Sequence, residues 1–307
     1  MRGSYSDPQA RQEARQLWAK ENVPSYAVGE VYPLRPLLSR WSDLVAVDVG
    51  ANKGFWTKAL MRTFGDGVRH VYLLDPSPEN QAELNNRDDN LIFAPEDFAR
   101  FSAHAVAAGS TSGEAVLYTN EDGSPLASLY PHAGDTETRR DQRIPVQVVT
   151  LDAFLDAQGV AHVDIVKLDV EGHELEVLKG AARALRSGRI DIVMWEFGRH
   201  HIESGCSFRD FHDLLSAAGF EVYSLASVGA RLIPEYDPEY ERFESEVMFA
   251  ARRRGAPLIA TPEGFTEEGY LEANPDVRGA VAGGVFASGR QHWLTFGHQE
   301  KRPLHPG

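Results

Sequence analysis

The stretch Leu44-Val45-Ala46-Val47-Asp48-Val49-Gly50-Ala51-Asn52-Lys53-Gly54 decides the fold of this chain. Its first six residues are almost all apolar and do not alternate, which is typical of a parallel strand covered on both faces. Gly50 then permits a tight turn, and a helical pattern follows at about 54–64. A strand that runs through such a turn into a helix presents backbone N–H groups to a ligand. The stretch therefore predicts a ligand site at the turn.

Similar apolar runs recur along the chain and end at Asp75, Gly109, Asp169 and Glu196. Because helical patterns separate most of them, we expect an α/β fold: a doubly wound, mostly parallel sheet with helices on both faces. Ligands of such sheets bind beyond the carboxyl ends of the strands, so these residues and Gly50 should share one edge. The expected elements include strands at 44–49, 68–74, 103–108, 163–168 and 190–195, a helix at 171–187 and a last strand at 246–251.

The composition narrows the class of protein. The 307 residues include 45 acidic and 31 basic side chains, a formal net charge of −14, which disfavours nucleic acid as a partner. Cys206 is the only cysteine, so we expect neither an intrachain disulfide nor a cysteine-based zinc site. The sequence has no apolar run of about 18 residues and no apolar secretory segment near Met1. We therefore expect a cytoplasmic protein without a transmembrane segment.

The distribution of proline and glycine predicts three parts. Residues 1–40, with a polar helix at 9–20, read as an N-terminal arm, 41–256 as the main domain, and 257–307 as a linker and a small, aromatic, helical module. The polar stretch 120–143 is expected to be a mobile loop. Loops of this kind carry binding residues, so we expect the arm and this loop to contact the substrate.

The first motif is the turn around Gly50 together with Asp75, which lies 25 residues later. A carboxylate at the end of the second strand can accept both hydroxyls of a ribose. Asn52 stands where a dinucleotide-binding turn has its middle glycine, which disfavours a pyrophosphate. We therefore expect S-adenosylmethionine, whose cation suits an acidic pocket. The alternative is that Gly50 and Gly54 only permit close packing of strand and helix.

The second motif places Asp169, Glu171 and His173 within five residues at the end of a strand. Two carboxylates and an imidazole at the ligand edge could bind a substrate hydroxyl and remove its proton. Glu174 and Glu176 fit ordinary capping of the following helix, because the helix dipole favours carboxylates in its first turn.

The third motif is Glu196 with His200 and His201, of which at most one histidine should face the site. Carboxylates and imidazoles could also hold a metal ion, with Asp169, Glu171, Glu196 and His200 as ligands. No ligand spacing of a known kind supports this arrangement, so we do not favour a divalent metal and assign no metal ligand.

At these motifs the chain resembles the FkbM family of S-adenosylmethionine-dependent methyltransferases. The resemblance extends over roughly residues 43–225, and its pieces occur in the order that the family has. The matching pieces are Asp48-Val49-Gly50-Ala51-Asn52-Lys53-Gly54, Asp75-Pro76-Ser77-Pro78-Glu79-Asn80, Ala105-Val106-Ala107-Ala108-Gly109 with Gly113, Val149-Thr150-Leu151-Asp152-Ala153-Phe154-Leu155, and Lys167-Leu168-Asp169-Val170-Glu171-Gly172-His173-Glu174-Leu175-Glu176-Val177-Leu178-Lys179-Gly180.

The resemblance implies a class I methyltransferase fold with a Rossmann-like, seven-stranded sheet whose last strand is antiparallel. It also implies O-methylation of a sugar, a glycan or a related metabolite. The residues it assigns to cofactor binding are Asp48, Gly50, Ala51, Asn52, Gly54, Asp75, Ala107 and Asp169. The candidate catalytic residues are Glu171, His173, Asp169 and His200.

The chain departs from the family pattern at two places. Asp75 stands where the family more often has glutamate, and the strand around Ala107 offers no carboxylate for adenine, so we expect a backbone contact there. The tail, from Tyr270 to Arg302, resembles a short module appended to bacterial glycan-modifying proteins.

Two other functions stay open from the sequence. One is a nicotinamide-dependent oxidoreductase on the same fold, which would keep Gly50 and Asp75. The other is a non-catalytic glycan-binding or scaffold protein that works through its aromatic tail. The base of the methyltransferase also stays open, with Glu171 or His173 preferred and His200 second.

Overall fold

A computed structural model describes Pro24, Ala27, Glu30, Val31 and Leu34, and then residues 42–131, 140–226, 229–244, 246–252, 265–283, 288–293 and 302–306. The helix predicted at 9–20 lies outside the described residues.

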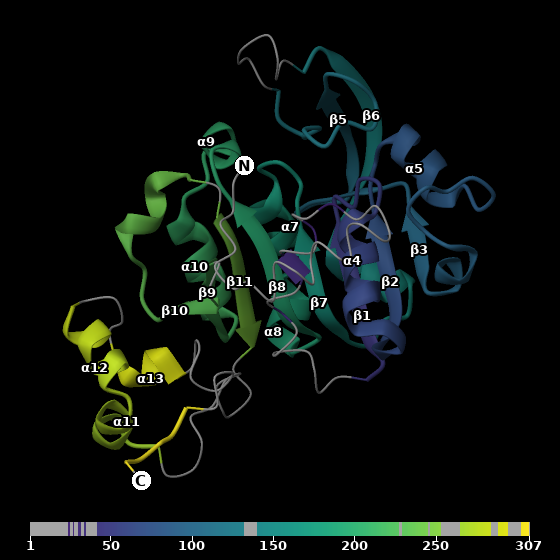
Figure 1. The fold of residues 1–307 in the computed structure, drawn as a ribbon. Helices are drawn as coiled ribbons and strands as arrows, with labels where there is room; N and C mark the ends of the chain where they lie inside the picture. The colour runs from purple at the N-terminus through teal and green to yellow at the C-terminus, as the bar shows by residue number, and fades with distance from the viewer. Residues whose placement is uncertain are drawn as a thin grey trace.

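A large twisted sheet forms the centre of the molecule (Figure 1). Its strand order is β10-β9-β11-β8-β7-β1-β2-β3. The strands are β1 Leu44–Val49, β2 Val68–Leu74, β3 Phe101–His104, β7 Val163–Leu168, β8 Ile190–Phe197, β9 Phe220–Ala226, β10 Gly229–Ile233 and β11 Glu246–Arg252. The five from β3 to β8 are parallel, whereas β11 runs antiparallel to both of its neighbours. The predicted sheet with an antiparallel last strand is confirmed, and β10 extends it by one strand that the sequence analysis missed.

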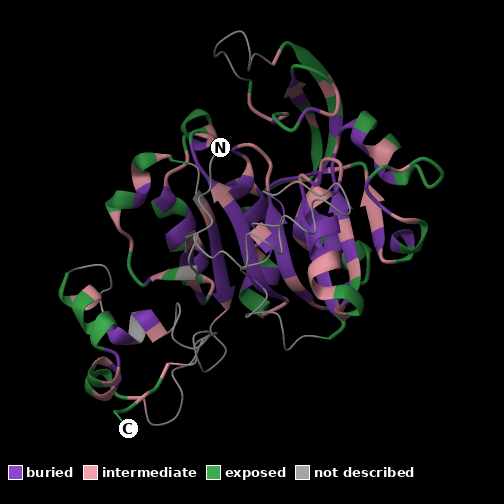
Figure 2. Cartoon of the chain, in the orientation of Figure 1, coloured by how far each residue is buried: buried purple, intermediate pink, exposed green. Residues whose placement is uncertain are grey.

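Helices cover both faces of this sheet (Figure 1). One face packs against α6 Leu151–Ala157, α7 Glu174–Gly180, α8 Ala182–Ser187 and α10 Phe208–Ala217. The other packs against α4 Phe55–Phe64 and α5 Pro78–Asn85. Figure 2 shows that the sheet between them is buried along most of its length.

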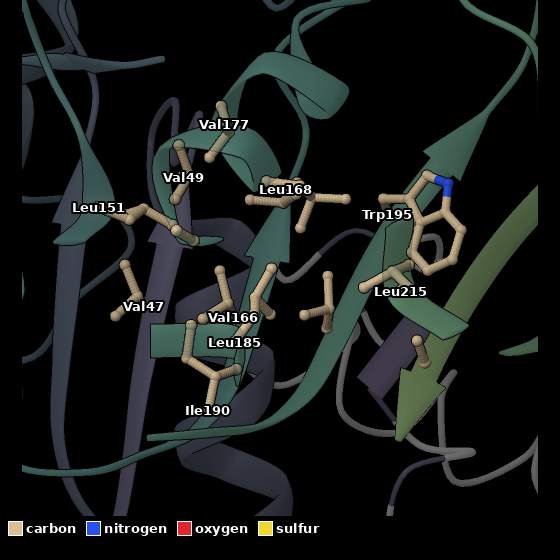
Figure 3. Close-up of a cluster of buried hydrophobic side chains, with 14 of the residues drawn as sticks. Val47, Val49, Leu151, Val166, Leu168, Val177, Leu185, Ile190, Trp195 and Leu215 are labelled. Atoms are coloured by element: carbon tan, nitrogen blue, oxygen red, sulfur yellow. The ribbon is translucent and has the colours of Figure 1, made fainter. Parts of the chain in front are cut away.

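The alternation of side chains along the strands builds the first apolar layer. Val47 of β1, Val166 of β7 and Trp195 of β8 point to the side where Leu185 and Leu215 lie (Figure 3). Each of these five side chains is at most 1% exposed. Burying them removes a large apolar area from water, which is the main force that holds helices to a sheet.

The second apolar layer includes part of the predicted N-terminal arm. Ala27, Val31 and Leu34 are fully buried and belong to the same cluster as Leu60 of α4 and Ile192 of β8. These three residues of the arm are therefore part of the core of the main domain, whereas Pro24 and Glu30 are half-buried.

The predicted strand at 103–108 is wrong, because two short strands in different sheets replace it. β3 ends at His104, and the Val106 N–H bonds back to the His104 carbonyl at 2.9 Å, so the chain turns sharply at this point. Ala107–Ala108, strand β4, then joins a small sheet with β5 Gly113–Thr119 and β6 Gln142–Val149.

The predicted helix at 171–187 is also wrong at its start and its middle. Glu171 and Gly172 both have positive φ, 52° and 103°, a backbone conformation that no α-helix contains. The helix α7 therefore begins at Glu174. It ends at Gly180, which lies so close to the Gly109 backbone that a Cβ would sit 2.0 Å from the Gly109 oxygen. A separate helix, α8, follows.

The described part of the tail forms three short helices, α11 Glu267–Ala273, α12 Pro275–Ala282 and α13 Gly289–His292. Tyr270 is fully buried, and its hydroxyl lies 2.9 Å from Nδ1 of His292. The boundary of this module stays a prediction.

Among the described residues, no helix has the length and apolar character that crossing a membrane requires.

Gly50 joins three strand ends. Its N–H donates to the Leu74 carbonyl at 2.8 Å, and the neighbouring Val49 carbonyl accepts from the Asp169 N–H at 3.0 Å. Gly50 has a φ of +74°, and a Cβ on it would lie 1.9 Å from the Asp169 oxygen. Only glycine permits this approach of the β1 turn to β7.

We expect Gly50→Ala to prevent folding or to lower the free energy of unfolding by more than about 3 kcal/mol, because a buried backbone must move as well. Gly205→Ala is the matched control, since Gly205 also has positive φ (68°), in the left-handed region, but has no atom within 4 Å of a Cβ. It should cost only about 1–2 kcal/mol. Urea unfolding of both variants measures this, and equal losses would contradict the packing argument.

Candidate functional site

A cleft of about 560 Å³, including space open to solvent, lies at the carboxyl ends of β1, β2 and β7. The small sheet β4-β6-β5 stands beside these ends (Figure 1). Five residues assigned to cofactor binding line the cleft, and so do two of the candidate catalytic residues, Asp169, which is in both sets, and His173. The five are Gly50, Asn52, Asp75, Ala107 and Asp169.

Asp75 presents a carboxylate that several groups hold in place. Oδ2 accepts the Asn52 N–H at 2.8 Å, and Oδ1 accepts from the Ser77 N–H at 3.0 Å and from Nδ2 of Asn80 at 3.1 Å. Burial raises the pKa of Asp75 to about 6, although these hydrogen bonds oppose the shift. Because a carboxylate offers about four acceptor positions, capacity for a ligand hydroxyl is left.

The stretch expected to be a mobile loop lies across the cleft in its described part. Asn52 Nδ2 donates to the Gly123 carbonyl at 3.0 Å, and the Ser77 hydroxyl donates to Asp122 at 2.6 Å. Leu129 of this stretch, together with Leu117 of β5, contributes apolar surface to the cleft wall. The lining of the cleft therefore combines apolar side chains with the Asp75 carboxylate.

Three residues assigned to cofactor binding do not line the cleft. Asp48 is fully buried beneath it, where its Oδ2 accepts from the Thr57 hydroxyl at 2.8 Å. Ala51 is 5% exposed and packs in the second apolar layer. Gly54 has a φ of +82°, and a Cβ there would lie 2.6 Å from the Phe93 ring, so close packing accounts for this glycine.

The turn 169–173 brings the second motif to the edge of the sheet. Asp169 and His173 line the cleft, but Glu171 does not. The Glu171 carboxylate lies 3.8 Å from the Arg140 guanidinium, and its carbonyl accepts from the Ser128 hydroxyl at 2.7 Å. Burial raises the pKa of Glu171 to about 8, and the neighbouring Asp169 and Glu174 carboxylates add to the shift.

Glu174 supports this turn from below. Its carboxylate is buried and accepts the Val170 N–H at 2.9 Å and the Gly172 N–H at 3.0 Å. His201 of α9 (His200–Ser204) lies 3.0 Å from the same carboxylate. Burial alone would raise the pKa of Glu174, but hydrogen bonding and the charge of His201 outweigh it and lower the pKa to about 2. The predicted capping role of Glu174 therefore extends to the whole turn.

His173 faces the small sheet. Its Nδ1 lies 3.2 Å from the Tyr130 hydroxyl, and a Cβ on Gly109 would lie 3.0 Å from its Nε2. Burial lowers the pKa of His173, which favours the neutral imidazole at pH 7. A neutral ring with one nitrogen fixed by Tyr130 can accept a proton at the other.

His200 is not among the residues that line the cleft, so its role as a base stays a prediction. Its Nε2 lies 3.4 Å from the Glu196 carbonyl, on the first turn of α9. The sequence analysis missed this helix, because a five-residue helix carries too little periodic pattern to detect.

The four metal ligands considered from the sequence, Asp169, Glu171, Glu196 and His200, do not form one cluster in the part of the chain that the structure describes. Among the described residues, two groups have ligand atoms within 4.8 Å of one another, and neither includes Asp169 or Glu171. One is Glu174, His200 and His201, and the other is His162, Asp164 and Asp191. In the first group, both carboxylate oxygens of Glu174 already accept hydrogen bonds from backbone N–H groups, which compete with a metal ion for these oxygens.

The groups in the cleft fit an adenosyl sulfonium. The Asp75 carboxylate can accept ribose hydroxyls, and the side chains of Ala107, Leu117 and Leu129 form an apolar surface for a base. Asp169 places a second carboxylate at the far side of the Gly50 turn, where it would attract a cation.

Comparisons with known proteins find relatives among methyltransferases. The model of the methyltransferase FkbM domain family matches residues 48–222. Hexuronic acid methyltransferase AglP of Haloferax volcanii is 29% identical over 208 residues, which are 67% of this chain and 74% of that protein.

Among solved structures, a methyltransferase FkbM from Methylobacillus flagellatus has a TM-score of 0.42 at 18% identity. The match covers 68% of this chain and 43% of that one, so it spans less than half of that protein. A putative O-methyltransferase from Klebsiella pneumoniae has a TM-score of 0.40 at 11% identity, with coverage of 81% and 91%.

Glu174→Gln tests the support of the turn. A carboxyl group whose pKa is lowered stabilises the fold above its unfolded pKa of about 4.5, and this stability is lost as pH falls toward 2. We expect the variant to unfold more easily than the parent protein at pH 6, by about 1–3 kcal/mol, and the difference to vanish near pH 2. Urea unfolding across this pH range measures it. A difference that does not depend on pH would contradict the assignment.

Asp75→Asn tests the ribose contact. An amide keeps the size of the side chain but replaces one acceptor oxygen with a donor that faces backbone N–H groups. We expect the affinity for S-adenosylhomocysteine, measured by calorimetry, to fall at least about tenfold. Asp66→Asn, at an exposed position away from the cleft, should leave it unchanged. Unchanged affinity in Asp75→Asn would refute the contact.

Proposed function

The chain belongs to the FkbM methyltransferase family, and on this premise we propose that it is an S-adenosylmethionine-dependent O-methyltransferase that modifies a hydroxyl group of a sugar or glycan. The observation that carries the proposal is that Asp75 and Asp169 both face one cleft, with the Gly50 turn between them. Support for a sugar comes from the name of the Haloferax relative, a hexuronic acid methyltransferase.

The cofactor that this family uses supplies a methyl group on a sulfonium cation. We assign Asp75 to the ribose hydroxyls, and Ala107, with Leu117 and Leu129, to the adenine. Asn52 and Gly50 would lie along the methionine part. This assignment keeps the carboxylates of Asp75 and Asp169 at opposite ends of the cofactor.

Asp169 is our candidate for the residue that takes the proton of the acceptor hydroxyl. It follows β7 directly, lines the cleft and accepts a hydrogen bond from Nζ of Lys167 at 3.0 Å, which fixes its orientation. His173 also lines the cleft, but its Nε2 lies against Gly109 at the small sheet, and Glu171 lies beside Arg140 and does not line the cleft. Proton removal by a positioned group is typically worth 10²–10⁴ in rate.

The other functions fit less well. A nicotinamide oxidoreductase would need room for a pyrophosphate at the turn that contains Asn52. The Asn52 side chain occupies this turn and donates a hydrogen bond to the Gly123 carbonyl. A scaffold that works through the tail would have no use for a cleft lined by Asp75 and Asp169. A cytoplasmic location stays a prediction from the sequence.

Asp169→Asn and Glu171→Gln separate the candidate bases. We expect Asp169→Asn to lower the turnover of methyl transfer about 100-fold or more and to change S-adenosylhomocysteine affinity less than about threefold. Glu171→Gln should keep turnover within about tenfold. Initial rates with radiolabelled S-adenosylmethionine and glycan extracts measure both, with thermal melting as the control for folding.

The pH dependence supplies a second readout for the same pair. If Glu171 were the base, turnover would rise with pH through about 8, where its carboxyl loses its proton, and Glu171→Gln would remove this rise. A large loss in Glu171→Gln together with a mild effect of Asp169→Asn would overturn our assignment.

A further inference from the structure

A second cavity lies next to the cofactor cleft, at the carboxyl ends of β7 and β8. It has about 220 Å³, including space open to solvent. Its lining includes Glu30, Lys167, Asp169, Met194, Glu196 and Val247. Asp169 is the residue that lines both cavities. A group bound in the second cavity would therefore lie across Asp169 from the cofactor cleft.

Lys167 contributes a positive charge to the lining of this cavity. Its ammonium lies 3.0 Å from Oδ2 of Asp169 and 3.5 Å from Oδ1 of Asp48, and its side chain is 8% exposed. Burial alone would lower the pKa of Lys167, but the surrounding carboxylates outweigh this and raise it. The ammonium is already committed to Asp48 and Asp169, so it orients Asp169 and leaves little attraction for an anionic ligand.

Glu30, which belongs to the N-terminal segment, is one of the lining residues of the cavity. Its neighbours Ala27, Val31 and Leu34 are buried in the second apolar layer, and this packing holds Glu30 above the strand ends. Among the residues that the structure describes, none forms a hydrogen bond or ion pair with the Glu30 carboxyl. Glu30 is half-buried where it lines the cavity, so a ligand in the cavity can reach its carboxyl and supply a hydrogen bond.

The charges around Glu30 favour its neutral form. Burial raises the pKa of Glu30 to about 8, Lys167 opposes this shift, and Asp169, Glu196 and Asp48 add to it. At neutral pH a protonated carboxyl donates one hydrogen bond and accepts others, as a ligand hydroxyl does. Glu30 and Asp169 together offer a donor and acceptors across a small cavity.

We propose that this cavity is the acceptor subsite of the enzyme, and that it takes a neutral, hydroxyl-bearing part of a sugar with Glu30 as a hydrogen-bonding partner. The proposal rests on the proposed function and names where its acceptor binds. A hydroxyl held between Glu30 and Asp169 would lie beside the group that removes its proton. The lining includes three carboxyl groups, those of Glu30, Asp169 and Glu196, which disfavour a carboxylate or phosphate in the cavity itself.

The test uses the full chain saturated with S-adenosylhomocysteine and methyl α-D-glucopyranoside as the probe. Saturation-transfer NMR titrations give its dissociation constant. We expect Glu30→Ala to raise this constant at least tenfold and Glu30→Gln to change it less than threefold, since an amide both donates and accepts. Glu96→Gln, an exposed control on another surface, should have no effect.

Four results would decide against the proposal or its premise. The subsite would be overturned if the parent chain did not bind the glucoside, or if the parent chain and Glu30→Ala bound it with the same dissociation constant. Tighter binding of methyl α-D-glucosaminide, which carries an ammonium, would overturn the neutral ligand class. Loss of S-adenosylhomocysteine binding in Glu30→Ala would assign Glu30 to the cofactor or to folding. Failure of the parent chain to bind S-adenosylhomocysteine would instead refute the proposed function.

Discussion

The close approach of the β1 turn to the end of β7 constrains the rest of the site. A Cβ on Gly50 would lie 1.9 Å from the Asp169 carbonyl oxygen, and hydrogen bonds at this point tie β1 to β2 and β7. The carboxyl ends of three strands therefore meet where their next residues, Gly50, Asp75 and Asp169, face one cleft. The position of each carboxylate follows from backbone geometry, so the chemistry of the cleft depends on a contact that involves no side chain.

Buried charge gives the site its second constraint. Lys167 could not stay buried without partners, and Asp48 below it and Asp169 beside it supply them. Asp48, which the family resemblance assigns to cofactor binding, therefore also balances the buried charge of Lys167. This arrangement also holds Asp169 between the two cavities, where the Glu30 carboxyl faces it from a segment distant in sequence.

Local patterns predicted the parallel strands and the residues at their ends, because apolar runs and turn residues act over a few positions. β1, β2 and β7 have the predicted bounds. Local patterns could not predict the contacts between segments that are distant in the sequence. Nothing near Glu30 in the sequence indicates Lys167 as its neighbour, and the support of the 169–173 turn by His201 depends on the missed helix α9. The predicted helix at 171–187 likewise divides next to Gly180, which packs against the distant Gly109 backbone.

The central claim is that the cleft between Asp75 and Asp169 holds the methyl donor with its sulfonium end toward Asp169 and the second cavity. A crystal structure with S-adenosylhomocysteine tests it most directly. The account predicts the ribose hydroxyls within hydrogen-bond distance of Asp75, the adenine against Leu117 and Leu129, and the sulfur on the Asp169 side of the Gly50 turn. A ribose bound away from Asp75, or a sulfur at the opposite end of the cleft, would contradict it.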